Sequence, residues 1–118
     1  MIPIPEDVRV ERPADGTSVV VFSGEHDLAT KREVSELLDS LVRWDTLIVA
    51  DFSSAVFVDT SILRVLLDTS KQARELGKVL RLQLGTAAIV RRAFEIVGVF
   101  EVIEHVATRE EALVRGGQ

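Results

Sequence analysis

The 118-residue chain carries 14 lysines and arginines against 19 aspartates and glutamates, a formal net charge of −5. This length suits one domain over 1–118, and the acidic balance argues against a nonspecific nucleic-acid binder, which would gather Lys and Arg on one face. The chain has no cysteine, which excludes disulfides, thiolate metal sites and a cysteine nucleophile.

The first residues, MIPIPEDVRVERP, carry acids and prolines where a signal peptide needs a basic start and a long apolar stretch. No run in the chain approaches the ~18 consecutive apolar residues that a membrane span requires. We therefore expect a cytoplasmic protein with no membrane partner.

The first half of the chain predicts a hairpin, a helix and a buried strand. Residues 8–11 and 18–24 are strand-like and flank the turn-forming PADG, which predicts an antiparallel hairpin. Apolar residues then recur at helical spacing over 31–44. Residues 47–52, LIVADF, form the continuous apolar run that is typical of a parallel strand covered on both faces.

The second half alternates helices and strands. An amphipathic helix begins near Ser61 and is expected to end at Gly77. Residues 79–84 alternate in the two-residue period of a strand with one buried face. A third helix, ended by Gly98, should bury Ile89, Val90, Ala93, Phe94 and Val97. A last strand is expected in VFEVIEHV, 99–106, before a short final helix.

Hydroxyl residues predict where three of the helices begin. Thr30 with Glu33, and Thr108 with Glu111, have the spacing of a capping box, and Thr86 stands where it could cap the third helix. We expect all three hydroxyls to cap.

This order predicts an α/β fold with a mixed, mostly parallel sheet of about five strands and about four helices. Strands separated by single helices imply right-handed crossovers, and the first hairpin adds an antiparallel edge. Residues 115–118, ending in GGQ, are expected to form a flexible tail.

Asp59, Thr60 and Ser61 stand where the chain passes from the third strand into the second helix. Helix N-termini have unpaired backbone donors that bind side-chain oxygens, so capping alone explains one of these residues. Capping does not explain an acid followed by two adjacent hydroxyls. One hydroxyl therefore remains for another role, and ligand sites in open α/β sheets favour the carboxyl ends of strands.

Apolar residues surround this acid. Residues 56–58 precede it, and Ile62 and Val65 fall at or beyond the edge of the helix's buried stripe. We expect some of these side chains to be exposed and the Ser61 oxygen to project into water. Such a patch suggests a protein contact surface more than an enzyme pocket.

Four segments resemble the STAS domain family, in particular bacterial anti-sigma factor antagonists, over almost the whole chain. They are SGEHDLAT at 23–30, VADFSSAVFVDTSILRVLL at 49–67, GTAAIVRRAFEIVGV at 85–99 and TREEAL at 108–113. The most specific part is the acid, hydroxyl, hydroxyl opening of the second helix, which the family usually writes Asp-Ser-Ser-Gly-Leu-Gly. The resemblance implies a STAS fold and a binding protein that is not an enzyme and needs no cofactor.

The resemblance also implies a phosphorylation switch. The family's phosphorylated serine falls on Ser61, with Thr60 as second candidate. The unphosphorylated form would bind an anti-sigma factor that is also an ATP-dependent serine kinase, which frees a sigma factor. Phosphorylation by that kinase would end the binding, and a metal-dependent serine phosphatase would restore it. The partner-binding residues that follow from this are Asp27, Phe57, Asp59, Thr60, Ser61, Ile62, Arg64 and Val65.

The sequence departs from the family pattern at two positions where glycine is usual. Ile62 places a β-branched side chain beside the hydroxyl, where glycine would let a partner's backbone approach. Arg64 lies three residues after Ser61 and could reach a phosphate there across one helical turn.

Two other function classes remain open. A STAS scaffold or stressosome-like module would bind its partners without phosphorylation, and Ile62 and Arg64 fit that alternative. A small hydrolase or phosphotransferase using Ser61 would need a base, and the sequence places none. His26 and His105 lie far apart without a second ligand at metal-site spacing, so we expect no metal site and place both at the surface or at strand ends.

Overall fold

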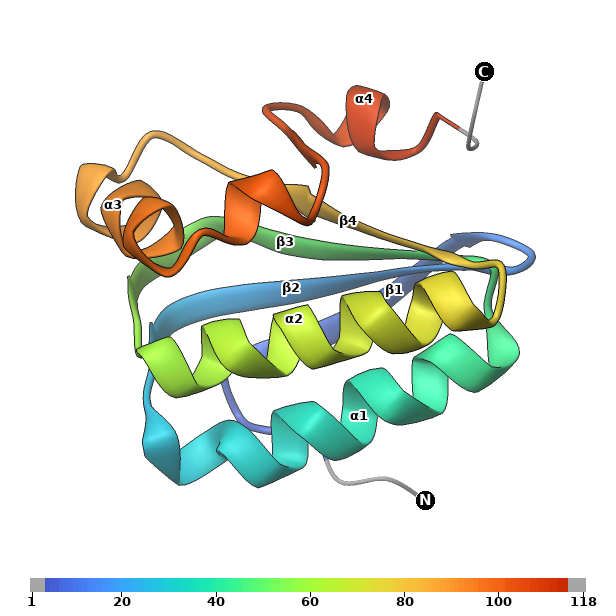
Figure 1. The fold of residues 1–118 in the computed structure, drawn as a ribbon, viewed down its shortest axis with the longest axis horizontal. Helices are drawn as coiled ribbons and strands as arrows, with labels where there is room; N and C mark the ends of the chain where they lie inside the picture. The colour runs from blue at the N-terminus through green and yellow to red at the C-terminus, as the bar shows by residue number, and fades with distance from the viewer. Residues whose placement is uncertain (1–3, 115–118) are drawn as a thin grey trace.

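The β-branched run after the first turn and the apolar run LIVADF form two neighbouring inner strands of a five-stranded sheet (Figure 1). The computed structural model describes residues 4–114, and the expected tail at 115–118 lies outside the described residues. The elements are β1 Val8–Ala14, β2 Thr17–His26, the 3₁₀ turn η1 Leu28–Thr30, α1 Lys31–Trp44, β3 Leu47–Val58, α2 Thr60–Glu75, β4 Val79–Gln83, α3 Ala88–Val97, the 3₁₀ turn η2 Val99–Glu101, β5 His105–Val106 and α4 Arg109–Ala112.

The sheet has the order β1-β2-β3-β4-β5. β1 pairs antiparallel with β2, and the other three neighbouring pairs are parallel. The predicted α/β class, the mixed sheet and the antiparallel edge hairpin are therefore confirmed. Because β2, β3 and β4 run in one direction, their carboxyl ends meet at one edge of the sheet, which is where sites form in this architecture.

Both faces of the sheet are covered. α1 and α2 lie side by side on one face, and α4 lies on the other (Figure 1). The predicted helical stripe of α1, Val34, Leu37, Leu38 and Leu41, is buried as expected, and Val42 is buried as well. A smaller apolar cluster under α4 contains Val19, Val21, Leu47, Val49 and Ala112.

Three aromatic rings fix α3 at the carboxyl edge of the sheet. Phe22 of β2 stacks on Phe52 of β3 with ring centroids 4.4 Å apart, and Phe94 of α3 meets Phe52 edge-on at 5.2 Å. The loop before α3 comes so close to β3 that a Cβ on Gly85 would lie 2.9 Å from the Ser53 carbonyl oxygen. Glycine is therefore required there, and α3 is held beside the ends of the strands.

One of the three predicted caps forms. The Glu111 N–H donates to Thr108 Oγ1 at 3.1 Å, and Glu111 Oε1 accepts from the Thr108 N–H at 3.1 Å, which is the predicted capping box of α4. Thr30 makes no side-chain cap, because the η1 turn precedes α1 and is capped by Asp27 instead. Thr86 makes no cap either, since α3 begins one residue later and its N-cap is Ala87.

Three expectations for the second half are wrong. The predicted strand 99–106 is a strand only at His105–Val106, since η2 and a turn bury Val99 and Ile103 without strand pairing. The exposed fraction of Ile89 is 63%, so this residue is not on the buried side of α3. β4 is buried on both faces, not one, because α4 covers its second face and encloses Arg81 and Gln83.

Two arginines join α4 to the sheet. Arg81 is 5% exposed, its Nε donates to Glu104 at 2.6 Å, and one guanidinium nitrogen donates to the carbonyls of Ala112 at 2.7 Å and Val114 at 2.6 Å. Arg109 donates to Glu11 at 2.8 Å and to the buried Asp51 at 3.2 Å. The buried polar residues Asp51, Arg81 and Gln83 therefore each form a hydrogen bond with a residue of α4. In the described range, no helix is long and apolar enough to cross a membrane.

Candidate functional site

β3 runs six residues beyond its predicted end at Phe52 and carries the site at its carboxyl end. Its pairing with β2 shifts register twice, between Val21 and Ser23 and between Gly24 and Glu25, and each shift places an extra residue on β3. Such bulges re-aim side chains. As a result the consecutive residues Val56 and Phe57 are both exposed, at 55% and 41%. The expectation that part of this apolar run is exposed is confirmed.

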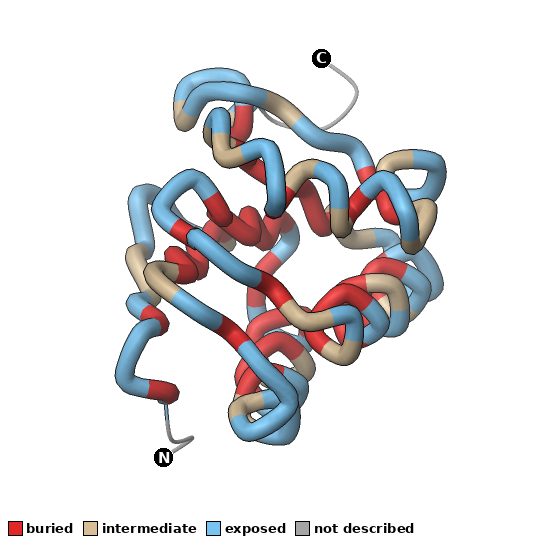
Figure 2. The backbone as a smooth tube through the Cα atoms, turned by 90° about the vertical axis from the view of Figure 1, so that its left-hand side faces the viewer, coloured by how far each residue is buried: buried red, intermediate tan, exposed pale blue. Residues whose placement is uncertain are grey.

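The ends of β2 and β3 bring two acidic caps together. His26 pairs with Val58, and the Asp59 N–H donates to the His26 carbonyl at 2.8 Å, so Asp27 and Asp59 follow neighbouring strand ends. The Asp27 carboxylate accepts from the Ala29 N–H at 3.0 Å and opens η1. Figure 2 views the molecule from this edge, where exposed segments surround the buried strands. Of the predicted partner-binding residues, Asp27, Phe57 and Asp59 thus lie in one region.

Asp59 is the N-cap of α2. Its Oδ2 accepts from the Ser61 N–H at 2.8 Å. The Ser61 hydroxyl close to the carboxylate, together with that backbone N–H, holds the pKa of the Asp59 carboxyl below its ordinary value. The hydroxyl does not reach hydrogen-bonding geometry, so the backbone donor is the formed bond.

Asp59→Asn is expected to change how stability depends on pH. A carboxyl whose folded pKa is depressed stabilises the fold above its unfolded pKa of about 3.9, and that stabilisation is lost as the pH falls through the folded pKa. Asparagine caps nearly as well but carries no charge. Urea unfolding should therefore show wild type more stable than Asp59→Asn at neutral pH, with the difference shrinking in acid. A difference that stays constant with pH would contradict this assignment.

The two hydroxyls after Asp59 differ in exposure. Thr60 is exposed, whereas Ser61 is only partly exposed and its Oγ is buried without a hydrogen-bond partner among residues 4–114. The expectation that the Ser61 oxygen projects into water is therefore wrong for this conformation. Sequence spacing places both residues in the first turn of the helix but does not reveal the rotamer of either side chain.

The first turns of α2 hold three further predicted residues. Arg64 is exposed. Ile62 and Val65 are 0% and 4% exposed, so the expectation that they reach the surface is wrong. α2 packs against α1 on one side and α3 on the other, so its buried stripe is wider than a helix with a single neighbour would have. The surface of these turns is therefore formed by Thr60 and Arg64, not by these two apolar side chains.

Sequence reasoning missed apolar residues that add to the exposed set. Leu28 follows Asp27 directly and is 66% exposed. On α3, which packs against β3 and α2, Ile89 and Ile96 are exposed at helical spacing of seven residues. The seven-residue spacing places both on one face of the helix, but it does not show that this face is exposed, because the buried pair Val90 and Phe94 also has same-face spacing.

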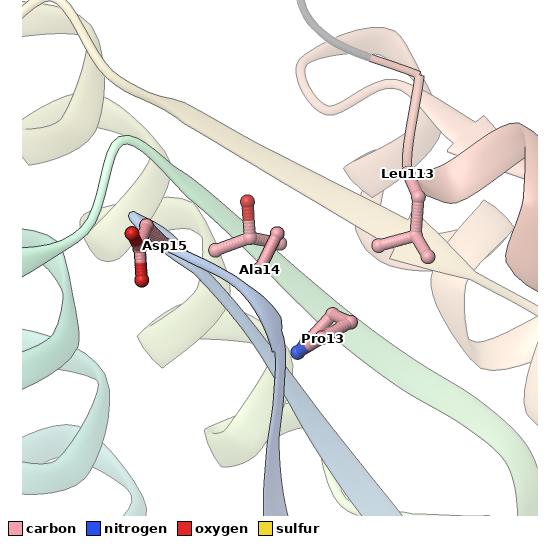
Figure 3. Close-up of a pocket in the computed structure, with 5 residues that line it drawn as sticks. Pro13, Ala14, Asp15 and Leu113 are labelled. Atoms are coloured by element: carbon pink, nitrogen blue, oxygen red, sulfur yellow. The ribbon is translucent and has the colours of Figure 1, made fainter.

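The two histidines differ in burial, and His26 lies directly before Asp27. His26 sits at a strand end as expected but is buried, with Nε2 2.8 Å from the Ser23 carbonyl oxygen, while His105 is exposed. Within 4–114, no three His, Cys, Asp or Glu residues gather as they would to hold a metal ion. A pocket of about 450 Å³ lies at the opposite end of the sheet, beside the hairpin turn (Figure 3), and is lined by Pro13, Ala14, Asp15, Thr17 and Leu113.

Comparisons with solved structures find this fold in regulatory and transport-related proteins. SpoIIAA, an anti-sigma factor antagonist, aligns in its unphosphorylated form with TM-score 0.78 and 21% identity, over 90% of this chain and 92% of that one. Its phosphorylated form, described as a Bacillus cell fate determinant, aligns with TM-score 0.71 and 20% identity over 90% and 96%.

Two other proteins show the range of the fold. An anti-sigma factor antagonist from Mycobacterium paratuberculosis aligns with TM-score 0.73 and 28% identity over 90% and 89%. A sulfate transporter family protein from Wolinella succinogenes aligns with TM-score 0.72 and 14% identity over 87% and 86%. A comparison with curated sequences finds no significant match. The STAS domain model matches residues 9–112, and the chain therefore belongs to the STAS domain family.

Proposed function

We propose that the chain is an anti-sigma factor antagonist. Its unphosphorylated form binds an anti-sigma factor of the ATP-dependent serine kinase type and thereby frees a sigma factor. Phosphorylation at the start of α2 ends the binding, and a metal-dependent serine phosphatase restores it. The family pattern assigns the phosphate to Ser61, with Thr60 beside it as the second candidate.

The observation that carries this proposal is the exposed apolar and hydroxyl surface at the carboxyl edge of the sheet. Val56 and Phe57 are exposed in the part of β3 that extends beyond its predicted end at Phe52, and Leu28 is exposed on the neighbouring segment. Aromatic and aliphatic residues that a protein keeps in water near polar groups mark contact surfaces. A charge added at Thr60 or Ser61 would enter that contact.

Several features favour binding over catalysis. Among the described residues no base forms a hydrogen bond with the Ser61 hydroxyl, and His26 Nε2 is already bonded to a backbone carbonyl. The solved proteins with this fold include anti-sigma factor antagonists. We place the activity in the cytoplasm, because the proposed kinase needs ATP, and we assign the chain no cofactor and no direct contact with nucleic acid.

A second function is favoured by one specific observation. The Ser61 oxygen is covered, and Ile62 fills the position beside it where the family pattern has glycine. A STAS scaffold that binds partners without phosphorylation at this site would have no need of an accessible serine. This alternative keeps the same contact surface but removes the switch.

Binding to anti-sigma factors tests the proposal. Each anti-sigma factor of the serine kinase type from the cells that produce this chain would be titrated with wild type and with Phe57→Ser by calorimetry. Removing a central aromatic contact should weaken binding about 30-fold, since such residues contribute ~2 kcal/mol or more. Trp44→Ser is the matched control, because Trp44 is an aromatic residue that is 79% exposed and lies at the carboxyl end of α1, outside the proposed surface.

The outcomes separate the candidates. Binding that Phe57→Ser weakens and Trp44→Ser does not would support the proposed surface. Binding to none of these anti-sigma factors would overturn the antagonist. Binding that survives incubation with ATP and leaves the mass of the chain unchanged would favour the scaffold.

A further inference from the structure

A buried carboxylate holds the first of the two bulges that carry β3 to the proposed contact surface. We propose that Asp51, anchored by Arg109 of α4, is a positioning residue that sets the register of β3 and thereby places Phe57 on the surface. The inference rests on the proposed function, since Phe57 matters only if a partner binds there. The placement of Phe57 itself can be measured on the chain alone.

The first bulge of β3 lies between Asp51 and Ser54. Val21 of β2 pairs with Asp51, and Ser23 pairs with Ser54, so three steps along β3 match two steps along β2. The pairing with β4 ends at Asp51, so β3 has only one neighbouring strand from this point on. A residue inside a bulge loses its place in the ladder, and its N–H then needs another acceptor. Ser53 is such a residue.

Asp51 supplies the acceptor. Its Oδ1 accepts from the Ser53 N–H at 2.9 Å and from Ser53 Oγ at 2.6 Å. Both bonds join residues only two apart, so the carboxylate closes a turn inside the strand. The loop before α3 packs against the same residue, since a Cβ on Gly85 would lie 2.9 Å from the Ser53 carbonyl oxygen. The bulged residue is therefore fixed by the carboxylate and by this loop.

Arg109 holds the second oxygen of the carboxylate. Its Nη2 donates to Asp51 Oδ2 at 3.2 Å, and Asp51 is only 3% exposed. A charge this deeply buried depends on its partner, because little water reaches it. With both oxygens bonded, the carboxylate is held in the orientation that serves Ser53. α4, on the face of the sheet opposite α1 and α2 (Figure 1), thereby contributes to the geometry of β3 at its carboxyl end.

The bulge decides which side chains of β3 face outward. Side chains alternate along a strand, so a shift of one residue moves each of them to the other face. Without the extra residue, and with the second bulge unchanged, Phe57 would take the position of Val58, which pairs with His26 and is 3% exposed. In the observed register Phe57 is 41% exposed. The bonds from Ser53 to Asp51 therefore favour the register in which Phe57 can touch a partner.

Fluorine NMR tests the placement of Phe57. The five phenylalanines would be labelled as 4-fluorophenylalanine, and the Phe57 resonance identified by its absence in Phe57→Leu. A dissolved paramagnetic probe broadens resonances that it can approach, so Phe57 should be strongly broadened in wild type. In Asp51→Ala the folded chain should show a Phe57 resonance that the probe broadens much less. Asp51→Asn should recover most of the broadening, because its amide oxygen still accepts from the Ser53 N–H.

Asp45→Ala is the matched control for lost stability. Asp45 is also a buried carboxylate, 1% exposed, and Arg12 donates to its two oxygens at 2.6 and 3.0 Å. It caps the carboxyl end of α1 and makes no bond within a bulge. Asp45→Ala should therefore destabilise the fold without changing the broadening of Phe57.

Arg109→Ala tests the anchor and keeps the inference testable if Asp51→Ala does not fold. It should give a protected Phe57 resonance in a fraction of the molecules. Arg81→Ala, which weakens the attachment of α4 without removing a bond to Asp51, should not. Wild-type broadening of Phe57 in Asp51→Ala, or in Arg109→Ala where the former does not fold, would overturn the inference. Equal protection in Asp45→Ala would overturn it as well.

Calorimetry with the anti-sigma factor relates this placement to binding. Asp51→Ala should weaken binding about 10-fold or more, as the loss of a central aromatic contact does. The double variant Asp51→Ala with Phe57→Ser should bind no more weakly than Phe57→Ser alone, because Asp51 acts through Phe57. Unchanged affinity in Asp51→Ala, or additive losses, would overturn the positioning role. Absence of binding by wild type would instead overturn the proposed function, and the fluorine measurement would still decide the placement of Phe57.

Discussion

A single phosphate at the start of α2 is expected to lower the affinity for the anti-sigma factor by about 100-fold or more while the fold persists. The group adds about −1.5 to −2 charges at neutral pH. Inside a contact it must lose hydration, and an unpaired buried charge costs several kcal/mol, whereas ~1.4 kcal/mol already amounts to tenfold in affinity. Asp59, next to Thr60, adds like charge.

The same phosphate should not unfold the chain. It lies at the positive end of the helix macrodipole, which favours an anion there by about 0.3 to 1 kcal/mol. Solved structures carry this fold for SpoIIAA in both its unphosphorylated and its phosphorylated form. Phosphorylation is therefore expected to act at the surface, through charge, without a second fold.

Calorimetry on separated forms checks both parts of this prediction. The phosphorylated and unphosphorylated chains would be resolved by ion exchange, titrated with the anti-sigma factor and melted in parallel. Enzymatic dephosphorylation should restore the affinity of the first sample, which controls for damage during preparation. Equal affinities of the two forms, or a lower affinity explained by a collapsed melting curve, would contradict the mechanism.

The scaffold of the site could be predicted from sequence because its signals are local. The apolar period of α1 predicts both ends of that helix, and the Asp59 cap and Gly77 bracket α2. Continuous apolar residues predict that β3 is a parallel strand covered on both faces, and it pairs in parallel with β2 and β4. These patterns depend on helix and strand geometry alone, so packing between distant segments does not change the elements they predict.

The surface of the site depends on packing between distant segments, which spacing does not encode. Ile62 and Val65 are buried because α3 covers the side of α2 that α1 leaves open. Phe57 is exposed because two bulges carry β3 past its apolar run. The covered Ser61 oxygen depends on one side-chain rotamer. Predictions of which side chains are exposed therefore fail at positions whose neighbours come from elsewhere in the chain.

β4 shows that packing between distant segments can also bury a charged residue. The alternation in VLRLQL predicts Arg81 and Gln83 on a solvent face, but α4 closes over that face. Arg81 then serves as the donor for carbonyls at the carboxyl end of α4, where a cation is favoured by the helix dipole. An arginine that the pattern assigns to the surface is thus one of the buried groups on which the fold depends.

Arg81→Ala is accordingly expected to lower the free energy of unfolding by about 2 to 4 kcal/mol. The substitution removes three short hydrogen bonds and leaves the buried carbonyl of Ala112 without its donor. Glu104 is 60% exposed and can be hydrated, which limits the cost to the carbonyls and the lost packing of the arginine stem. Arg81→Lys should recover part of the loss, since it keeps the charge but not the fork of donors.

Urea unfolding of matched variants measures this effect. Arg32→Ala is the control, because Arg32 is 90% exposed and 3.9 Å from Glu36, and such pairs change stability by less than about 0.5 kcal/mol. Native-state hydrogen exchange of Arg81→Ala should show faster exchange in α4 than in α1, since α4 rests on the arginine and α1 on the opposite core. Stability equal to that of Arg32→Ala would mean that water replaces the guanidinium at these carbonyls, and that α4 is held by its apolar contacts and by the ion pairs of Arg109.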